Sequence, residues 1–217
     1  MFFLFRVVHL MLLTPSFNSF QFPFDAEYFR SQGNILTGAI PSEIGMLTNL
    51  EEFWLQKNNL DGTIPTEIGA MTKLADFRIF ANNISGEIPE EVYGLPAVNR
   101  IDLYNTNITG TISTLIGRLT TLKQLRVRST NLYGNIPTEI GLLSELRSVW
   151  LHHSDFSGSV PGGLCQLRSD EMHLSELVTD CTVMQTSGLA AVSCPAGCCT
   201  ECCDQETNVC VYMEEIN

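Results

Sequence analysis

The chain repeats one stretch that decides its fold: Asn58-Asn59-Leu60-Asp61-Gly62-Thr63-Ile64-Pro65-Thr66-Glu67-Ile68-Gly69. The segment from 34 to 45 differs from it at only a few positions. A period of this length, kept without insertion, predicts a stack of repeated units rather than a single central core. The glycine of the stretch recurs every 24 residues, at Gly38, Gly62, Gly86, Gly110, Gly134 and Gly158.

Each copy also carries a strand pattern before this stretch. Leu50, Phe53 and Leu55 are spaced by three and two, and the alternation around Trp54 is typical of a short strand with one buried face. Because equivalent strands one repeat apart must run parallel, the sequence predicts a parallel sheet of six strands. The first of these copies, which begins at residue 26, is degenerate. On the opposite side, the spacing of three between Ile68 and Met71 favours a short 3₁₀ or helical turn.

The full pattern, Leu-x-x-Leu-x-Leu-x-x-Asn-x-Leu-x-Gly-x-Ile-Pro-x-x-Ile-Gly, resembles the plant-type leucine-rich repeat of extracellular proteins, and residues 50–69 are a close copy. The resemblance implies an α/β repeat solenoid, a right-handed arc with a parallel concave β-sheet and a 3₁₀ or irregular convex side. It also implies a receptor-like protein, a receptor-kinase ectodomain or an inhibitor. Such a protein binds a protein, peptide or glycan ligand on the concave face, with a membrane-anchored co-receptor as a further partner.

The chain departs from that family at its N-terminus, where no cysteine-paired cap is present, and it has no kinase motif. Residues 1–13 are strongly apolar but too short to span a membrane. This run, followed by Pro15, favours a secretory signal peptide, although Arg6 lies inside it and no Ala-x-Ala cleavage site follows. A truncated reading frame is the alternative. We expect a signal peptide or N-terminal capping segment in 1–25, leucine-rich repeats in 26–167 and an acidic, cysteine-rich cap in 168–217.

Charge and cysteine are both concentrated at the C-terminal end. The formal net charge is -12, and residues 165–217 hold nine acidic residues against the single basic Arg168. A nucleic acid is therefore an unfavourable partner, because phosphate binding needs a basic face. An even number of cysteines in a short terminal segment indicates a disulfide framework if the chain is secreted. The eight cysteines are Cys165, Cys181, Cys194, Cys198, Cys199, Cys202, Cys203 and Cys210.

In a reducing compartment the same cluster would bind metal, which keeps open a second hypothesis of an intracellular repeat scaffold with a metal-binding tail. Several cysteines are adjacent and crowd one another, whereas zinc sites use well-separated Cys-x-x-Cys pairs. We therefore favour disulfides and predict no metal and no cofactor. His152 and His153 have no third ligand nearby in the sequence. Between Cys165 and Cys181, residues 174–178 suggest a short amphipathic helix that closes the stack.

The outward strand positions are the expected ligand-binding site, since aromatic and arginine side chains dominate binding hot spots. The alternative is that these residues pair with one another, Arg78 with Asp102 and Asp76 with Arg100, across neighbouring strands. The predicted ligand-binding residues are Trp54, Arg78, Phe80, Asp102, Tyr104, Arg126, Arg128, Trp150 and His152.

Other motifs are weaker. Asn83 and Asn107 begin Asn-x-Ser/Thr sequons, which predict glycosylation if the chain is secreted. No nucleophile with a placed base and no paired-carboxylate motif is present, so the sequence predicts no enzyme. A structural surface protein, such as one that binds ice, needs a regular array of threonine or similar residues. The position after the repeated glycine is irregular, which argues against that function.

Overall fold

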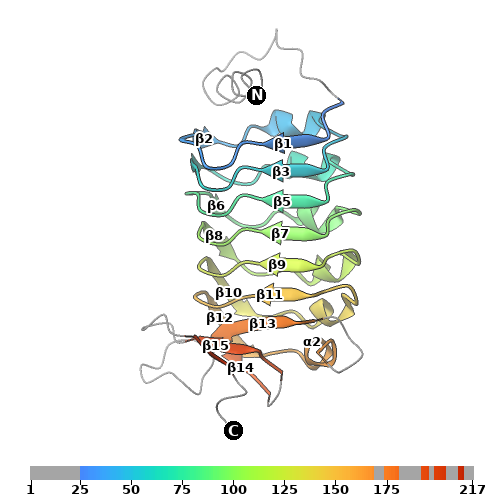
Figure 1. Ribbon diagram of the computed structural model, residues 1–217, viewed down its shortest axis with the longest axis vertical. Helices are drawn as coiled ribbons and strands as arrows, with labels where there is room; N and C mark the ends of the chain where they lie inside the picture. The colour runs from blue at the N-terminus through green and yellow to red at the C-terminus, as the bar shows by residue number, and fades with distance from the viewer. Residues whose placement is uncertain (1–24, 169–173, 181–191, 196–197, 204–209, 213–217) are drawn as a thin grey trace.

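The computed structural model describes residues 25–168, 174–180, 192–195, 198–203 and 210–212. These residues form a stack of coils, each adding one strand to a nine-stranded sheet (Figure 1). Neighbouring strands are parallel except for the last pair, which is antiparallel. In spatial order the sheet contains β1 (Tyr28–Arg30), β3 (Glu52–Trp54), β5 (Asp76–Arg78), β7 (Arg100–Asp102), β9 (Gln124–Arg126), β11 (Ser148–Trp150), β13 (Glu176–Asp180), β15 (Glu201–Cys203) and β16 (Cys210–Tyr212).

Two further layers complete each coil, and they lie on either side of the strand column in Figure 1. One layer is made of short parallel strands, β2 (Thr37–Ala39) with β4 (Asn59–Asp61), and then β6 (Ser85–Gly86), β8 (Asn107–Gly110), β10 (Asn131–Asn135), β12 (Asp155–Ser159) and β14 (Val192–Ser193). The other consists of 3₁₀ turns, η1 (Ser42–Met46), η2 (Thr66–Ala70), η3 (Glu90–Gly94), η4 (Thr114–Arg118) and η5 (Thr138–Leu142), followed by the helix α2 (Gly162–Gln166). The predicted repeat solenoid is confirmed.

The core is one continuous column of apolar side chains enclosed by the three layers. The first strands contribute phenylalanines whose rings lie one above the next, with centroids 5.6 Å apart for Phe29 and Phe53 and 6.0 Å for Phe53 and Phe77. Because a repeat contacts only its neighbours, this column carries stability from one coil to the next. The fixed inward positions explain why the apolar part of the pattern is so regular.

Polar side chains hold the turn after each concave strand, and they change character along the stack. Asn58 and Asn82 each bond the preceding coil. For example, Asn82 Nδ2 donates to the carbonyl of Leu55, and its Oδ1 accepts from the amide of Leu60. Thr106 occupies the next equivalent position, and its hydroxyl donates to the carbonyl of Leu103 in its own coil. A hydroxyl has fewer bonding groups and a shorter reach than a carboxamide, so this joint is less firmly tied.

The fourth repeat also lacks the proline of the pattern, and a neighbouring side chain compensates. Ser113 stands in the proline position, and its free backbone N–H donates to the Tyr93 hydroxyl, 3.3 Å away. The Ser113 hydroxyl accepts from the Leu115 amide and so caps η4. Burial is the main cause that raises the pKa of Tyr93 to about 12, so the phenol stays neutral. The substitution therefore leaves no unpaired donor at this position.

The C-terminal segment continues the sheet instead of closing it with a helix. The predicted helix at 174–178 is wrong, because Glu176–Asp180 is the strand β13. Its register on β11 pairs Trp150 with Val178, and the Leu151 amide donates to the Val178 carbonyl. The edge of the repeat sheet presents unpaired backbone groups, and pairing them with another strand outweighs local helix formation. The sheet consequently has nine described strands, where the repeats alone predict six.

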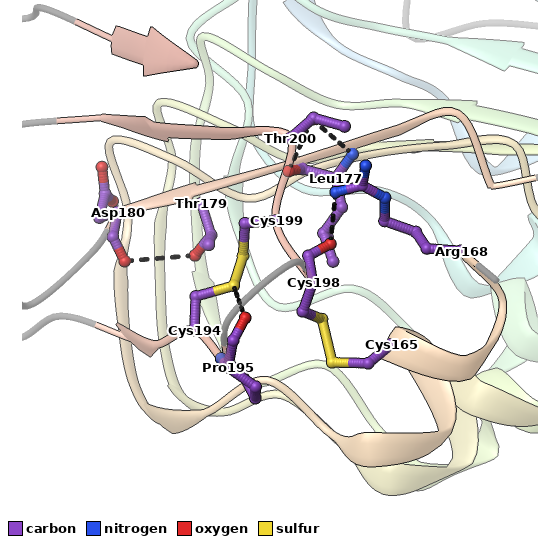
Figure 2. The surroundings of a disulfide bond; sticks show 10 residues. All are labelled: Cys165, Arg168, Leu177, Thr179, Asp180, Cys194, Pro195, Cys198, Cys199 and Thr200. Carbon is purple, nitrogen blue, oxygen red and sulfur yellow. Dashed lines mark hydrogen bonds between the residues drawn. A yellow bond between two sulfur atoms is a disulfide. The ribbon is translucent and has the colours of Figure 1, made fainter. Parts of the chain in front are cut away.

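Disulfides fix this extension to the last repeat (Figure 2). Cys165 on α2 is bonded to Cys198, whose carbonyl also accepts from Arg168 Nη1. Cys194 is bonded to Cys199, and Cys203 is disulfide-bonded as well. Cys181 lies outside the described residues, as do the side chains of Cys202 and Cys210 and the predicted signal peptide. Among the described residues, no helix has the length and apolar character needed to cross a bilayer.

Candidate ligand-binding face

The nine side chains predicted to bind ligand form two columns that run across the concave sheet. One column consists of the last residues of five strands, Trp54, Arg78, Asp102, Arg126 and Trp150, and the other of residues two positions further along the chain, just past the strand ends, Phe80, Tyr104, Arg128 and His152. Neighbouring members of a column lie one strand apart, as the register Trp54 to Arg78 and Arg78 to Asp102 shows. Six of the nine side chains are half-buried. Phe80, Asp102 and His152 are 9%, 0% and 8% exposed, because neighbouring side chains cover them. The face is therefore structured by its own contacts before any ligand arrives.

At the N-terminal end, Trp54 lies between two arginines. The guanidinium carbon of Arg30 is 4.4 Å from the centre of its ring and that of Arg78 is 4.1 Å away. Each arginine also has a carboxylate partner: Arg30 Nε lies 2.6 Å from Glu52, and Arg78 Nε lies 2.7 Å from Asp76. Cation–π contact and ion pairing together satisfy both cations. The two arginines of this cluster, which we call the closed cluster, are therefore paired, although Trp54 Nε1 is buried without a hydrogen-bond partner among the described residues.

These ion pairs correct the pairing expected from the sequence. Arg78 does not pair with Asp102, and Asp76 does not pair with Arg100. Both arginines instead bind an aspartate two residues away on their own strand. Stacking on Trp54 draws Arg78 towards β3 and away from β7, which leaves Asp102 to its own strand neighbour.

The middle of the face holds a buried carboxylate. Asp102 Oδ2 accepts from Arg100 Nε at 2.8 Å and from Arg100 Nη2 at 2.6 Å, and Arg126 Nη1 lies 4.0 Å away. Asp102 Oδ1, Gln124 Oε1 and Arg126 Nε are buried and have no hydrogen-bond partner among the described residues. Unsatisfied polar atoms of this kind are uncommon in folded proteins. They give the centre of the face unused hydrogen-bonding capacity.

The C-terminal half repeats the aromatic and arginine chemistry, but its carboxylates form no hydrogen-bonded ion pair with Arg126 or Arg128 among the described residues. Arg126 lies 4.1 Å from the ring centre of Trp150, and Arg128 lies 4.7 Å from that of Tyr104. Tyr104 stacks on Phe80 with centroids 4.1 Å apart. In the part of the chain that the structure describes, Arg128 makes no ion pair and Arg126 has only the distant Asp102. Two cations are thus held on aromatic rings without a hydrogen-bonded carboxylate partner in the described part of the chain.

His152 is uncharged at neutral pH. Burial, with smaller contributions from His153 and Arg128, lowers its pKa to about 3. The ring of His152 lies edge-on to that of His153, with centroids 4.9 Å apart. Within the described ranges, no group of three or more His, Cys, Asp or Glu side chains is gathered closely enough to hold a metal ion.

A pocket of about 260 Å³ lies beside Trp150, where the repeats meet the cap. Sequence reasoning missed the cap side of this pocket, since residues 174–178 were expected in a helix. It also missed Arg30, which lies in the degenerate first copy. The repeat period gave no signal for Glu176, because this residue pairs with Ser148 on the neighbouring strand at a separation of 28 residues and not 24. The lining residues are Arg128, Trp150, His152, Glu176, Val178 and Glu201.

Comparisons with known proteins agree with this architecture. The family model named Leucine Rich Repeat matches residues 49–71. The ectodomain of the Arabidopsis receptor kinase HAESA, solved with an N-terminally extended IDA peptide hormone, is 28% identical with a TM-score of 0.68, over 79% of this chain and 27% of that one. The plant peptide hormone receptor RGFR1, in complex with RGF2, is 28% identical with a TM-score of 0.65, over 76% of this chain and 24% of that one.

A plant ice-binding protein is similar too, at 30% identity and a TM-score of 0.62, over 64% of this chain and 46% of that one. No curated protein sequence matches the chain. The chain is therefore built of leucine-rich repeats like those of plant receptor ectodomains. It spans about a quarter of the length of the receptor ectodomains that it matches.

Proposed function

We propose that the chain is a non-catalytic extracellular module whose concave face binds an extended peptide. The observation that carries this proposal is that Arg126 and Arg128 lie on aromatic rings and that neither has a hydrogen-bonded carboxylate partner among the described residues. An anionic group of the ligand, a side-chain carboxylate or the C-terminal one, supplies the missing partner through charge-assisted hydrogen bonds. The half-buried rings of Trp150 and Tyr104 supply apolar contact area next to it.

The comparisons support a peptide over other ligand classes. HAESA and RGFR1 were both solved with peptides, and HAESA was also solved with the peptide hormone IDA and the co-receptor SERK1. We extend that arrangement to this chain as a proposal, with a membrane-anchored co-receptor as the second partner. The disulfides of the cap favour an oxidising compartment and hence secretion or the cell surface.

The test is capture of peptides from a defined pool. The immobilised full chain is incubated with random 12-residue peptides that have free C-termini, and with a matched pool that lacks Asp and Glu and is C-terminally amidated. We expect enrichment from the first pool only, and a loss of at least about tenfold in Arg126→Gln/Arg128→Gln. The control is Arg30→Gln/Arg78→Gln, which removes the same charge from the closed cluster. Equal capture of both pools, or equal loss in both variants, would contradict the proposal.

A second candidate function is binding to a regular surface such as ice. It is favoured by one observation on the layer of short strands that runs from β2 to β14. Asn59, Asn83, Asn107 and Asn131 occupy one position of four successive repeats, and all four are exposed. This series is more regular than the position after the glycine, and one similar structure is a plant ice-binding protein. Inhibition of ice recrystallisation by the chain, lost in Asn83→Asp/Asn107→Asp, would support this candidate. Glycans at Asn83 and Asn107 would cover the same surface.

A further inference from the structure

The pocket beside Trp150 is built from two parts of the chain with opposite charge. Arg128, Trp150 and His152 come from the last repeats, whereas Glu176, Val178 and Glu201 come from the cap strands β13 and β15. The cap strands lie next to β11 at the lower end of the sheet in Figure 1. The disulfides and the strand pairing fix the two parts relative to each other. The pocket is therefore a preformed feature of the joint between repeats and cap.

The carboxylate of Glu176 is positioned but not neutralised. Its Oε2 accepts from the Ser148 hydroxyl at 2.7 Å and from Trp150 Nε1 at 3.0 Å, and both donors are uncharged. Among the described residues, no lysine or arginine forms an ion pair with Glu176 or with Glu201. Arg128, the one cation that lines the pocket, stacks on Tyr104 instead. Two carboxylates against one arginine leave the pocket with an excess of negative charge.

His152 adds an independent observation. Its side chain is 8% exposed and lines the pocket, and its Nδ1 is buried with no hydrogen-bond partner among the described residues. In the neutral imidazole, Nδ1 can serve as a hydrogen-bond acceptor. A ligand with several N–H groups would supply the missing donor and would also meet the two carboxylates.

We propose that this pocket binds the cationic side chain of the peptide ligand, an arginine or lysine, with Glu176 and Glu201 as its counter-ions and Trp150 as an aromatic wall. The inference rests on the proposed function, since the cation belongs to a peptide that lies on the same face. It adds a specificity: the ligand carries a positive side chain next to the anionic group held by Arg126 and Arg128. The cap is then part of the binding site as well as the end of the stack.

The experiment uses Nα-acetyl-arginine amide as the probe and the isosteric, uncharged Nα-acetyl-citrulline amide as its matched control. Trp150 is the fluorescent reporter in a Trp54→Phe background, because the chain has two tryptophans. The arginine probe is expected to bind at millimolar concentration and at least about fivefold more tightly than the citrulline probe. Glu176→Gln and Glu201→Gln are each expected to abolish that preference. Glu87→Gln should leave that preference unchanged, since Glu87 is an exposed residue that directly follows β6.

Equal binding of the two probes, or equal preference in Glu201→Gln and Glu87→Gln, would overturn the inference. The first of these outcomes compares the two probes on the unsubstituted pocket, so it does not depend on how a pocket variant folds. The experiments also distinguish failure of this pocket assignment from failure of the proposed peptide-binding function. If anionic peptides are captured through Arg126 and Arg128 but the probes bind equally, only the pocket assignment fails. If the arginine probe binds and no peptide pool is enriched, the peptide-binding function fails.

Discussion

Trp54 and Trp150 occupy the same strand position four repeats apart, yet their surroundings differ. Arg30 and Arg78 cover Trp54, and each has a carboxylate within hydrogen-bonding distance. Arg126 covers Trp150 in the same way, but Gln124 stands where Asp76 stands beside Arg78. The contrast teaches that aromatic and arginine content does not identify a site by itself. The residue two positions earlier on the strand decides whether the arginine is already paired.

The largest expected effect is on stability, and it concerns Asp102, which lies between the Trp54 half and the Trp150 half of the face. Asp102 is fully buried and is the counter-ion of Arg100, with Arg126 at longer range. Asp102→Ala leaves these cations unpaired, and we expect it to lower the free energy of unfolding by about 3 kcal/mol. Asp76→Ala removes a more exposed partner and should cost about 1 kcal/mol or less. Urea denaturation of both variants measures the difference. Equal losses in the free energy of unfolding would contradict the account, because they would mean that Asp102 is no more buried than Asp76.

The next effect separates the two tryptophans in ligand capture. Trp150→Ala should weaken capture of the anionic peptide pool by about 2 kcal/mol, or roughly thirtyfold, because aromatic anchors dominate binding energy. Trp54→Ala should change capture less than about twofold, since the two arginines on its ring, Arg30 and Arg78, already have carboxylate partners. Comparable losses in the two variants would show that the ligand extends along the whole face.

A further effect is a pH dependence of stability that arises at His152, next to Trp150, and has no counterpart next to Trp54. The pKa of His152 is about 3 in the folded chain, against about 6.5 for an unperturbed histidine. Between these pH values the unfolded chain binds the extra proton, so stability falls as the pH is lowered from about 6.5 towards about 3. Gln56 occupies the position that corresponds to His152 on the strand of Trp54. His152→Gln should therefore remove on the order of 3 kcal/mol of acid destabilisation between pH 7 and pH 4.

Denaturation of both proteins at the two pH values isolates this contribution, because the remaining acidic residues are common to both. The same acid destabilisation with and without His152 would show that the imidazole is not buried as a neutral group.

The repeat architecture could be predicted from sequence because one packing requirement recurs every 24 residues, as in Phe29, Phe53 and Phe77. The cap could not, since residues 174–203 break the period and their strand pairing depends on the free edge of β11. The sequence predicted columns of outward residues, and the structure places five of the nine on the concave strands and four just past the strand ends; their role in ligand binding stays a prediction. Which arginines have a carboxylate partner was not predictable from residue spacing. Arg78 contacts the Trp54 ring on the neighbouring strand and Asp76 on its own strand, and both contacts together decide its orientation.

The central claim is that a missing counter-ion makes the C-terminal half of the face the ligand-binding half. Gln124→Asp tests it most directly, because it gives Arg126 the partner that Asp76 gives Arg78. Capture of the anionic peptide pool by the full chain is the measurement, with Asp76→Gln as the reciprocal variant. We predict that Gln124→Asp lowers capture by about tenfold and that Asp76→Gln does not lower it. Unchanged capture by Gln124→Asp would contradict the account.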